Sequence, residues 1–88
     1  MDQEQFRQQL RAEGYEQVTA VAREANGSLD VHTHPFEARA LILSGEISIR
    51  CDGHETLYRP GDIFHLGHAA PHSERYGPAG VSYLVGRK

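Results

Sequence analysis

The pattern of apolar and polar positions separates a short helical segment from a long β-rich remainder. Phe6 and Leu10 are four positions apart, so they share one face of a helix. Asp2, followed three residues later by Gln5, has the pattern of a capping box at a helix N-terminus. Because two large apolar residues do not stabilise an isolated helix, we expect residues 1–14 to form an N-terminal helix packed on the rest of the protein.

From Tyr15 onward, the chain consists of short runs of β-branched and apolar residues separated by turn residues about every 8 to 12 positions. Asp52-Gly53 is a strong signal for a tight hairpin. This pattern favours a β-sandwich or β-barrel over a helical or α/β protein, and we predict one all-β domain for residues 15–88. The expected strands are residues 17–22, 29–34, 38–43, 46–51, 54–59, 63–66, 72–76 and 81–85.

Composition narrows the class of protein. A chain of 88 residues, 39% hydrophobic and 24% charged, is typical of one small globular domain. Such small domains are often stabilised by a metal ion or a partner subunit, and we expect dimerisation or a metal to contribute here. The single cysteine excludes an internal disulfide.

Charge and hydropathy exclude several partners. The formal net charge is −3, and the arginines are scattered without a basic stripe, so we expect no nucleic-acid binding. No apolar run reaches the roughly 18 residues that a membrane-spanning helix needs. The polar N-terminus shows no secretory signal, and we expect a cytoplasmic protein.

Two histidines stand out in the segment His32-Thr33-His34. On a β-strand, residues two positions apart project from the same face, so both imidazoles would lie side by side. His72 lies far downstream, where the last strands of a barrel could return it to this pair. Three neutral imidazoles from separate strands would form a metal site with open coordination positions, whereas a His-x-His pair alone is more often a polar strand face.

The run His32-Thr33-His34-Pro35-Phe36-Glu37, with Gly27 before it and Gly45 after it, resembles the first motif region of the cupin superfamily. Pro60-Gly61-Asp62 followed by Pro71-His72 resembles the second region. The resemblance implies a double-stranded antiparallel β-barrel of the jelly-roll type, with the short helix preceding it. It also implies a dimer and one divalent metal ion held by His32, His34 and His72, often together with a glutamate.

Glu37 is the candidate for that glutamate, but only two residues separate it from His34, fewer than the family pattern has. Two arrangements therefore remain open. A local bulge turns Glu37 toward the metal, or the ligands are three histidines and water. We favour the second arrangement.

His65 is the candidate catalytic residue. It shares strand parity with Ile63, so we expect it to point into the barrel as a proton carrier or orienting group. The alternative is a hydrogen-bonded interior histidine without a catalytic role.

The resemblance implies several metal-dependent activities, among them isomerase, lyase and dioxygenase reactions, without choosing between them. We expect an enzyme that acts on a small organic substrate through Mn, Fe, Ni, Cu or Zn, since three imidazoles suit any of these ions. The alternatives are a non-catalytic module that binds a small ligand or senses a metal, and a scaffold whose metal is structural. Fold alone does not decide between them.

Overall fold

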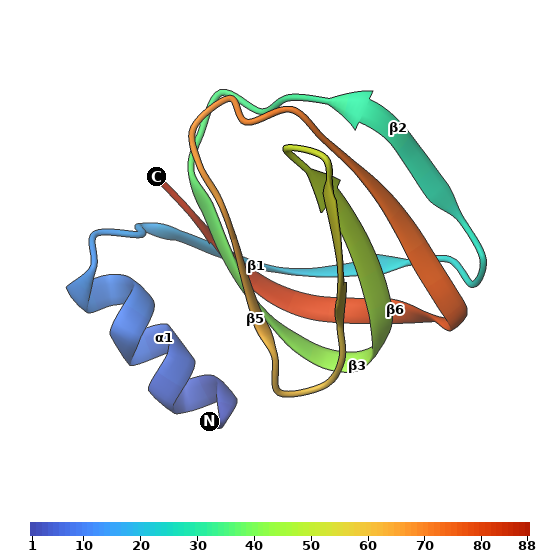
Figure 1. The fold of residues 1–88 in the computed structure, drawn as a ribbon. Coiled ribbons are helices and arrows are strands. Elements are labelled where there is room, and N and C mark those ends of the chain that lie inside the picture. Colours follow the sequence, from blue (N-terminus) through green and yellow to red (C-terminus); the bar gives the residue numbers. More distant parts are fainter.

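The computed structural model covers all 88 residues and contains one helix and six strands (Figure 1). All strand pairings are antiparallel, which confirms the predicted all-β fold with a short N-terminal helix. The elements are α1 (Gln3–Ala12), β1 (Gln17–Arg23), β2 (Ser28–His32), β3 (Ala38–Cys51), β4 (His54–Tyr58), β5 (Ile63–Leu66) and β6 (His72–Arg87).

Two long strands, β3 and β6, run through both faces of the barrel and pair with each other from Ala38–Arg87 to Cys51–His72. One face has the strand order β1-β6-β3-β5. The other face has the order β2-β6-β3-β4. Each of the shorter strands therefore lies at an edge, and the two long strands hold the barrel together (Figure 1).

The sequence predicted two separate strands where the structure has each of the long strands β3 and β6. The structure has a bend in each long strand in place of the predicted turn. The β3–β6 register shifts between Ile42 and Ser44 and again between Gly45 and Ile47. Gly45 has a φ of +70°, and a Cβ atom on it would lie 2.0 Å from the carbonyl oxygen of Gly80. The strands thus cross closely at glycines, bend, and continue pairing, since a bulge increases twist without ending a ladder.

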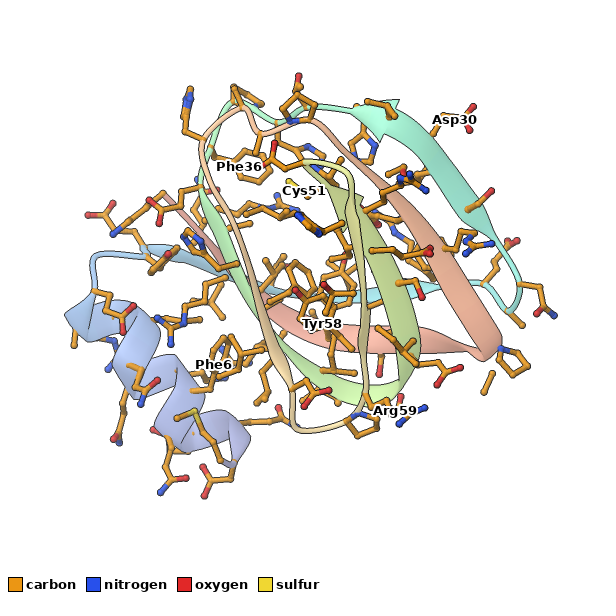
Figure 2. The ribbon with its side chains drawn as sticks, viewed as in Figure 1. Phe6, Asp30, Phe36, Cys51, Tyr58 and Arg59 are labelled. Atoms are coloured by element: carbon orange, nitrogen blue, oxygen red, sulfur yellow. The ribbon has the colours of Figure 1, made fainter.

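The apolar side chains form two clusters on opposite faces of the sheet that contains β3 and β6. The larger cluster fills the barrel interior and includes Ile42, Ile47 and Phe64. The smaller cluster lies outside the barrel, where Phe6 and Leu10 of α1 pack fully buried on neighbouring strands. Figure 2 shows Phe6 between the helix and the barrel.

The helix begins as the sequence predicted. The backbone N–H of Gln5 donates to the Asp2 side chain, and the backbone N–H of Asp2 donates to the Gln5 side chain, which closes the capping box. The Asp52-Gly53 hairpin is also confirmed, because Cys51 and His54 pair on either side of it. The structure contains no helix that is both long enough and apolar enough to span a membrane.

Candidate metal centre

Three histidines and one glutamate converge between β2 and the start of β6. One ligand atom from each of His32, His34, His72 and Glu74 lies within 4.8 Å of the others. His32 and His72 are paired across β2 and β6, and their ring centroids are 4.3 Å apart. The structure therefore brings together the three histidines that the sequence singled out.

Strand geometry explains this convergence. Cross-strand partners lie on the same face of an antiparallel pair, so His32 and His72 both project into the barrel. Glu74 is two residues after His72 on β6 and has the same orientation. His34 follows the end of β2, and its ring centroid is 4.8 Å from that of His32 and 5.4 Å from that of His72.

Backbone carbonyl groups fix the orientation of two imidazoles. The Nδ1 atom of His32 lies 2.7 Å from the carbonyl oxygen of Asp30, and Nδ1 of His72 lies 2.9 Å from that of Ala70. Because a carbonyl oxygen only accepts hydrogen bonds, each Nδ1 carries the proton and donates it. A neutral imidazole that carries its proton on Nδ1 presents Nε2 as a bare acceptor, and Nε2 of both rings faces the Glu74 carboxylate.

Glu74 supplies the carboxylate of the cluster, and its side chain is held on both sides. The Tyr76 hydroxyl donates to Oε1 at 3.0 Å. The other oxygen, Oε2, lies 3.1 Å from Nε2 of His72 and 3.4 Å from Nε2 of His32. Only 2% of His72 and 7% of Glu74 are exposed, so these groups are largely removed from water.

The donor set fits a divalent transition-metal ion. The Nε2 atom of His32 is buried without a hydrogen-bond partner. When both rings are neutral, two lone pairs and a carboxylate oxygen face one another with no proton between them, an arrangement that a central cation would relieve. Three imidazole nitrogens and one carboxylate oxygen are ligands of the kind that Mn, Fe, Ni, Cu and Zn accept.

His34 is kept in the neutral form that metal binding requires. Burial lowers its pKa below the usual value of 6.5, and the neighbouring His32 and His72 lower it further. Its ring stacks on Phe36, with centroids 4.9 Å apart and an interplanar angle of 20°. Figure 2 shows Phe36 at the end of the barrel opposite Arg59, so the cluster lies near one mouth of the barrel.

Glu37 does not join the cluster, which corrects the bulged arrangement considered from the sequence. The backbone of Glu37 pairs with Lys88 in both directions, and the next residue, Ala38, points into the barrel. The Glu37 side chain therefore projects outward. There its Oε2 accepts a hydrogen bond from Tyr15 at 3.0 Å and contacts Nε2 of His65 at 2.5 Å.

The contacts among Glu37, His65 and Tyr15 shift the pKa values of Glu37 and Tyr15. The hydrogen bonds from His65 and Tyr15 lower the pKa of Glu37 below its usual value of 4.5. Burial, followed by the contact with Glu37, raises the pKa of Tyr15 to about 12. The Glu37 carboxylate is thus an ionised link between the barrel and Tyr15, which lies in the segment after α1.

His65 also points away from the barrel interior, contrary to the parity that the sequence suggested. Phe64 and Leu66 on β5 face inward, while the side chain of His65 is 53% exposed and bonded to Glu37. Ile63 shares its orientation because it packs under α1, in the outer apolar cluster. The apolar character of Ile63 therefore did not indicate which face of β5 lines the barrel interior. The structure places His65 outside the metal-binding cluster.

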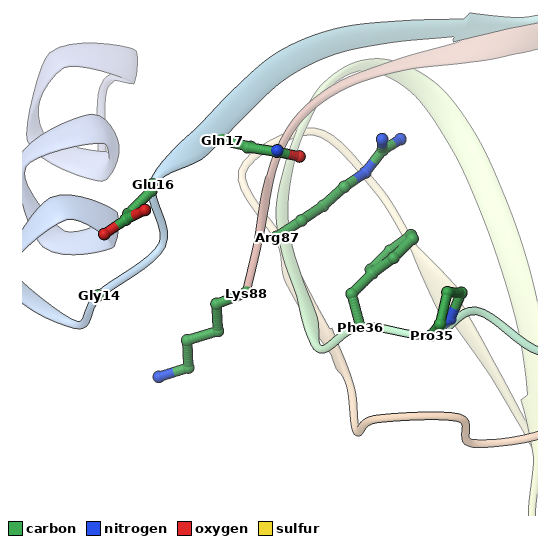
Figure 3. Close-up of a pocket in the computed structure, with 7 residues that line it drawn as sticks. All are labelled: Gly14, Glu16, Gln17, Pro35, Phe36, Arg87 and Lys88. Atoms are coloured by element: carbon green, nitrogen blue, oxygen red, sulfur yellow. The ribbon is translucent and has the colours of Figure 1, made fainter.

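A hollow of about 500 Å³ lies at the barrel mouth next to Phe36 (Figure 3). Its wall is formed by Gly14, Glu16, Gln17, Pro35, Phe36, Arg87 and Lys88. The Arg87 guanidinium carbon lies 4.9 Å from the centroid of the Phe36 ring. Phe36 therefore contacts both this hollow and His34 of the cluster.

Comparison with known proteins yields likenesses of structure but none of sequence family. No protein-family model and no curated protein matches the sequence. Among solved structures, an RmlC-like cupin from Shewanella frigidimarina has a TM-score of 0.68 and 17% identity, over 80% of this chain and 63% of that chain. The polyketide cyclase RemF from Streptomyces resistomycificus has a TM-score of 0.67 and 24% identity, over 80% and 52%.

A third similar structure is the DMSP lyase DddQ from Ruegeria pomeroyi. It has a TM-score of 0.73 and 28% identity, over 81% of this chain and 36% of that chain. This chain spans less than two thirds of the length of each of the three proteins. The likenesses to the RmlC-like cupin and the cyclase concern the fold alone.

Proposed function

We propose that this chain, which has the fold of the cupin superfamily, binds one divalent transition-metal ion and uses it to act on a small organic substrate. The ligands would be Nε2 of His32 and His72, an imidazole nitrogen of His34, and Oε2 of Glu74. The observation that carries the proposal is the convergence of these four side chains, in which Nε2 of His32 is buried without a hydrogen-bond partner.

The chain's own residues define what such a site can do. A divalent ion held there would supply Lewis acidity, polarising an oxygen atom of a bound substrate. Glu74 would neutralise one positive charge of the ion, and Tyr76 would keep Oε1 oriented away from it. Burial and the nearby Glu74 raise the pKa of both Tyr76 and Tyr83, so these hydroxyls stay protonated and serve as hydrogen-bond donors at neutral pH.

Catalysis is supported by one structural neighbour at 28% identity, which is a lyase by name. One observation favours a second candidate, a non-catalytic module that binds a small ligand or senses a metal. His65, the catalytic residue that the sequence suggested, pairs with Glu37 outside the cluster. Turnover would then depend on the metal, its ligands and the tyrosines alone.

Elemental analysis of protein purified without an affinity tag tests metal binding directly. We expect about one equivalent of a transition metal in the parent protein and a large loss in the His72→Ala and Glu74→Gln variants. A metal-free parent that also takes up no Zn²⁺, Co²⁺ or Mn²⁺ in calorimetric titration would refute the proposal.

A thermal-shift screen followed by product analysis distinguishes the two candidates. An enzyme converts at least one stabilising ligand, and Glu74→Gln abolishes conversion while the protein stays folded. A binding module is stabilised by its ligand without product formation.

A further inference from the structure

Arg87 is a cation without a counter-ion beside the metal-binding cluster. Two arginines are half-buried, Arg39 and Arg87; the other arginines are exposed. The Nε atom of each is buried without a hydrogen-bond partner. Arg39 forms an ion pair with Glu13 at 2.7 Å, whereas Arg87 forms no ion pair. A partly desolvated guanidinium without an acceptor is costly unless an anion completes it.

The orientation of Arg87 is fixed by the sheet. It continues the inward-facing series Val81, Tyr83 and Val85 on β6, so its side chain enters the barrel mouth. Its backbone pairs with Gln17 of β1 and with Ala38 of β3, on either side of β6. The guanidinium is therefore carried by a strand that is held from both sides and is not on a mobile loop.

Phe36 links this guanidinium to the metal ligands. The Arg87 guanidinium carbon lies 4.9 Å from the Phe36 ring centroid, and that centroid lies 4.9 Å from the ring of His34. The separation of Arg87 from His34 is at most the sum of these distances.

Arg87 borders the hollow at the barrel mouth together with Phe36 and Gln17 (Figure 3). The hollow is thus lined by a guanidinium, an aromatic ring and an amide, together with the Lys88 ammonium and the Glu16 carboxylate. A guanidinium presents parallel N–H donors that match the two oxygens of a carboxylate.

We propose that Arg87 binds a carboxylate of the substrate while an oxygen atom at the other end of the same molecule approaches the metal-binding cluster. The substrate class is then a small carboxylic acid with a second oxygen donor a few bonds away. This inference rests on the proposed metal site and specifies what that site accepts.

Dicarboxylates of different length test the inference on the Co²⁺-loaded protein. Co²⁺ uptake is measured first, and acetate, succinate, glutarate and inorganic phosphate are then titrated while the visible absorption of Co²⁺ is followed. The variants are Arg87→Gln and, as a control, Arg50→Gln, which alters an exposed arginine on β3. Neither variant removes a ligand of the proposed metal site.

In the parent we expect succinate or glutarate to bind about tenfold or more tightly than acetate, because one molecule contacts two sites. Arg87→Gln should remove this advantage, a loss of about tenfold that matches one charge-assisted hydrogen bond, and should leave Co²⁺ affinity unchanged. Arg50→Gln should resemble the parent in both measurements.

The outcomes separate this inference from the proposed function. A parent protein that takes up no Co²⁺ refutes the metal site and this inference with it. Normal Co²⁺ uptake with a dicarboxylate affinity that does not depend on Arg87 refutes the inference alone. Phosphate that binds more tightly than both dicarboxylates through Arg87 overturns the choice of a carboxylate.

Discussion

Glutamine in place of Glu74 should weaken metal binding without weakening the metal-free fold. The Glu74→Gln side chain keeps its shape and loses its negative charge. In the parent, Oε2 faces Nε2 of His72 at 3.1 Å and Nε2 of His32 at 3.4 Å, and all three atoms are acceptors when the rings are neutral. A glutamine amide in this position would donate N–H groups to both rings.

The stability change follows from the hydrogen bonds gained and lost. Each new neutral hydrogen bond contributes about 1 kcal/mol, and the bond from Tyr76 weakens by about 1 kcal/mol because its acceptor is no longer charged. The free energy of unfolding of the metal-free protein should thus rise by about 0 to 1 kcal/mol. For a domain of this size, that is at most about 8 °C in Tm.

The effect on the metal has the opposite sign. Loss of a group that only orients a ligand typically reduces affinity by about 10- to 100-fold, and Glu74 is the only anionic member of the ligand set. We therefore expect Zn²⁺ affinity to fall by about 100-fold or more.

Calorimetric titration with Zn²⁺ and thermal melting in the presence of a chelator measure the two effects separately. Glu55→Gln is a matched control, because Glu55 is an exposed glutamate bound to Arg75 and lies outside the cluster. Unchanged Zn²⁺ affinity in Glu74→Gln would refute the ligand assignment. A metal-free Glu74→Gln protein that melts more than 10 °C below the parent would refute the assigned tautomers. A fall in Tm of this size corresponds to a loss of about 1 to 3 kcal/mol in the free energy of unfolding.

Three further outcomes are expected. Tyr76→Phe should lower Zn²⁺ affinity by about 10- to 100-fold because Glu74 loses its orienting donor, whereas Tyr58→Phe should leave it unchanged; equal affinities in calorimetry would contradict this role. The pKa of Glu37 is lowered in the folded state, so its stabilising contribution is present above pH 4.5 and is lost as the pH falls through the lowered value. The Tm of Glu37→Gln should therefore depend less on pH between about 3 and 5 than the Tm of the parent. Parallel curves of Tm against pH for the two proteins would exclude this contribution. Free Zn²⁺ at about 100 times its Kd should stabilise the parent by about 2.7 kcal/mol, a shift that a chelator reverses, and a Zn²⁺-independent Tm would show that the folded state binds no metal.

The features that the sequence predicted correctly depend on short-range geometry. The Asp2–Gln5 capping box and the Asp52-Gly53 turn are settled by residues within a few positions of one another. His32 and His34 were placed together by strand parity, and the resemblance to cupins added His72. The expected homodimer and cytoplasmic location stay predictions.

Glu74 was missed although the sequence contained a signal for it. His72-Ser73-Glu74 has the same alternation as His32-Thr33-His34, so parity alone would have placed Glu74 beside His72. Glu37 is the glutamate nearest to the first motif in the sequence, but its side chain points outward to His65. Its outward orientation depends on pairing with Lys88, which is far away in the sequence.

His65 shows a second limit of parity arguments. The helix covers part of the outer barrel surface, so β5 carries apolar residues on both faces. Parity states which residues of a strand share a face, but only the packing of α1 reveals which face is interior. The bends at Gly45 and Gly80 were also not predictable from local sequence. A glycine in the sequence is compatible both with the end of a strand and with a bulge inside a longer strand.

The position of β2 gives the metal-binding cluster a consequence for backbone motion. This strand pairs with β6 alone, through a register that is irregular between Leu29 and His32. Edge segments with few protected amides open more readily than central strands and exchange their amide hydrogens sooner. Because His32 comes from β2 while His72 and Glu74 come from β6, an ion bound by all three would hold β2 against β6 and reduce the opening of this edge strand. The rate of amide hydrogen exchange on β2 would then report metal occupancy, while the long central strands would exchange at the same rate with or without the ion.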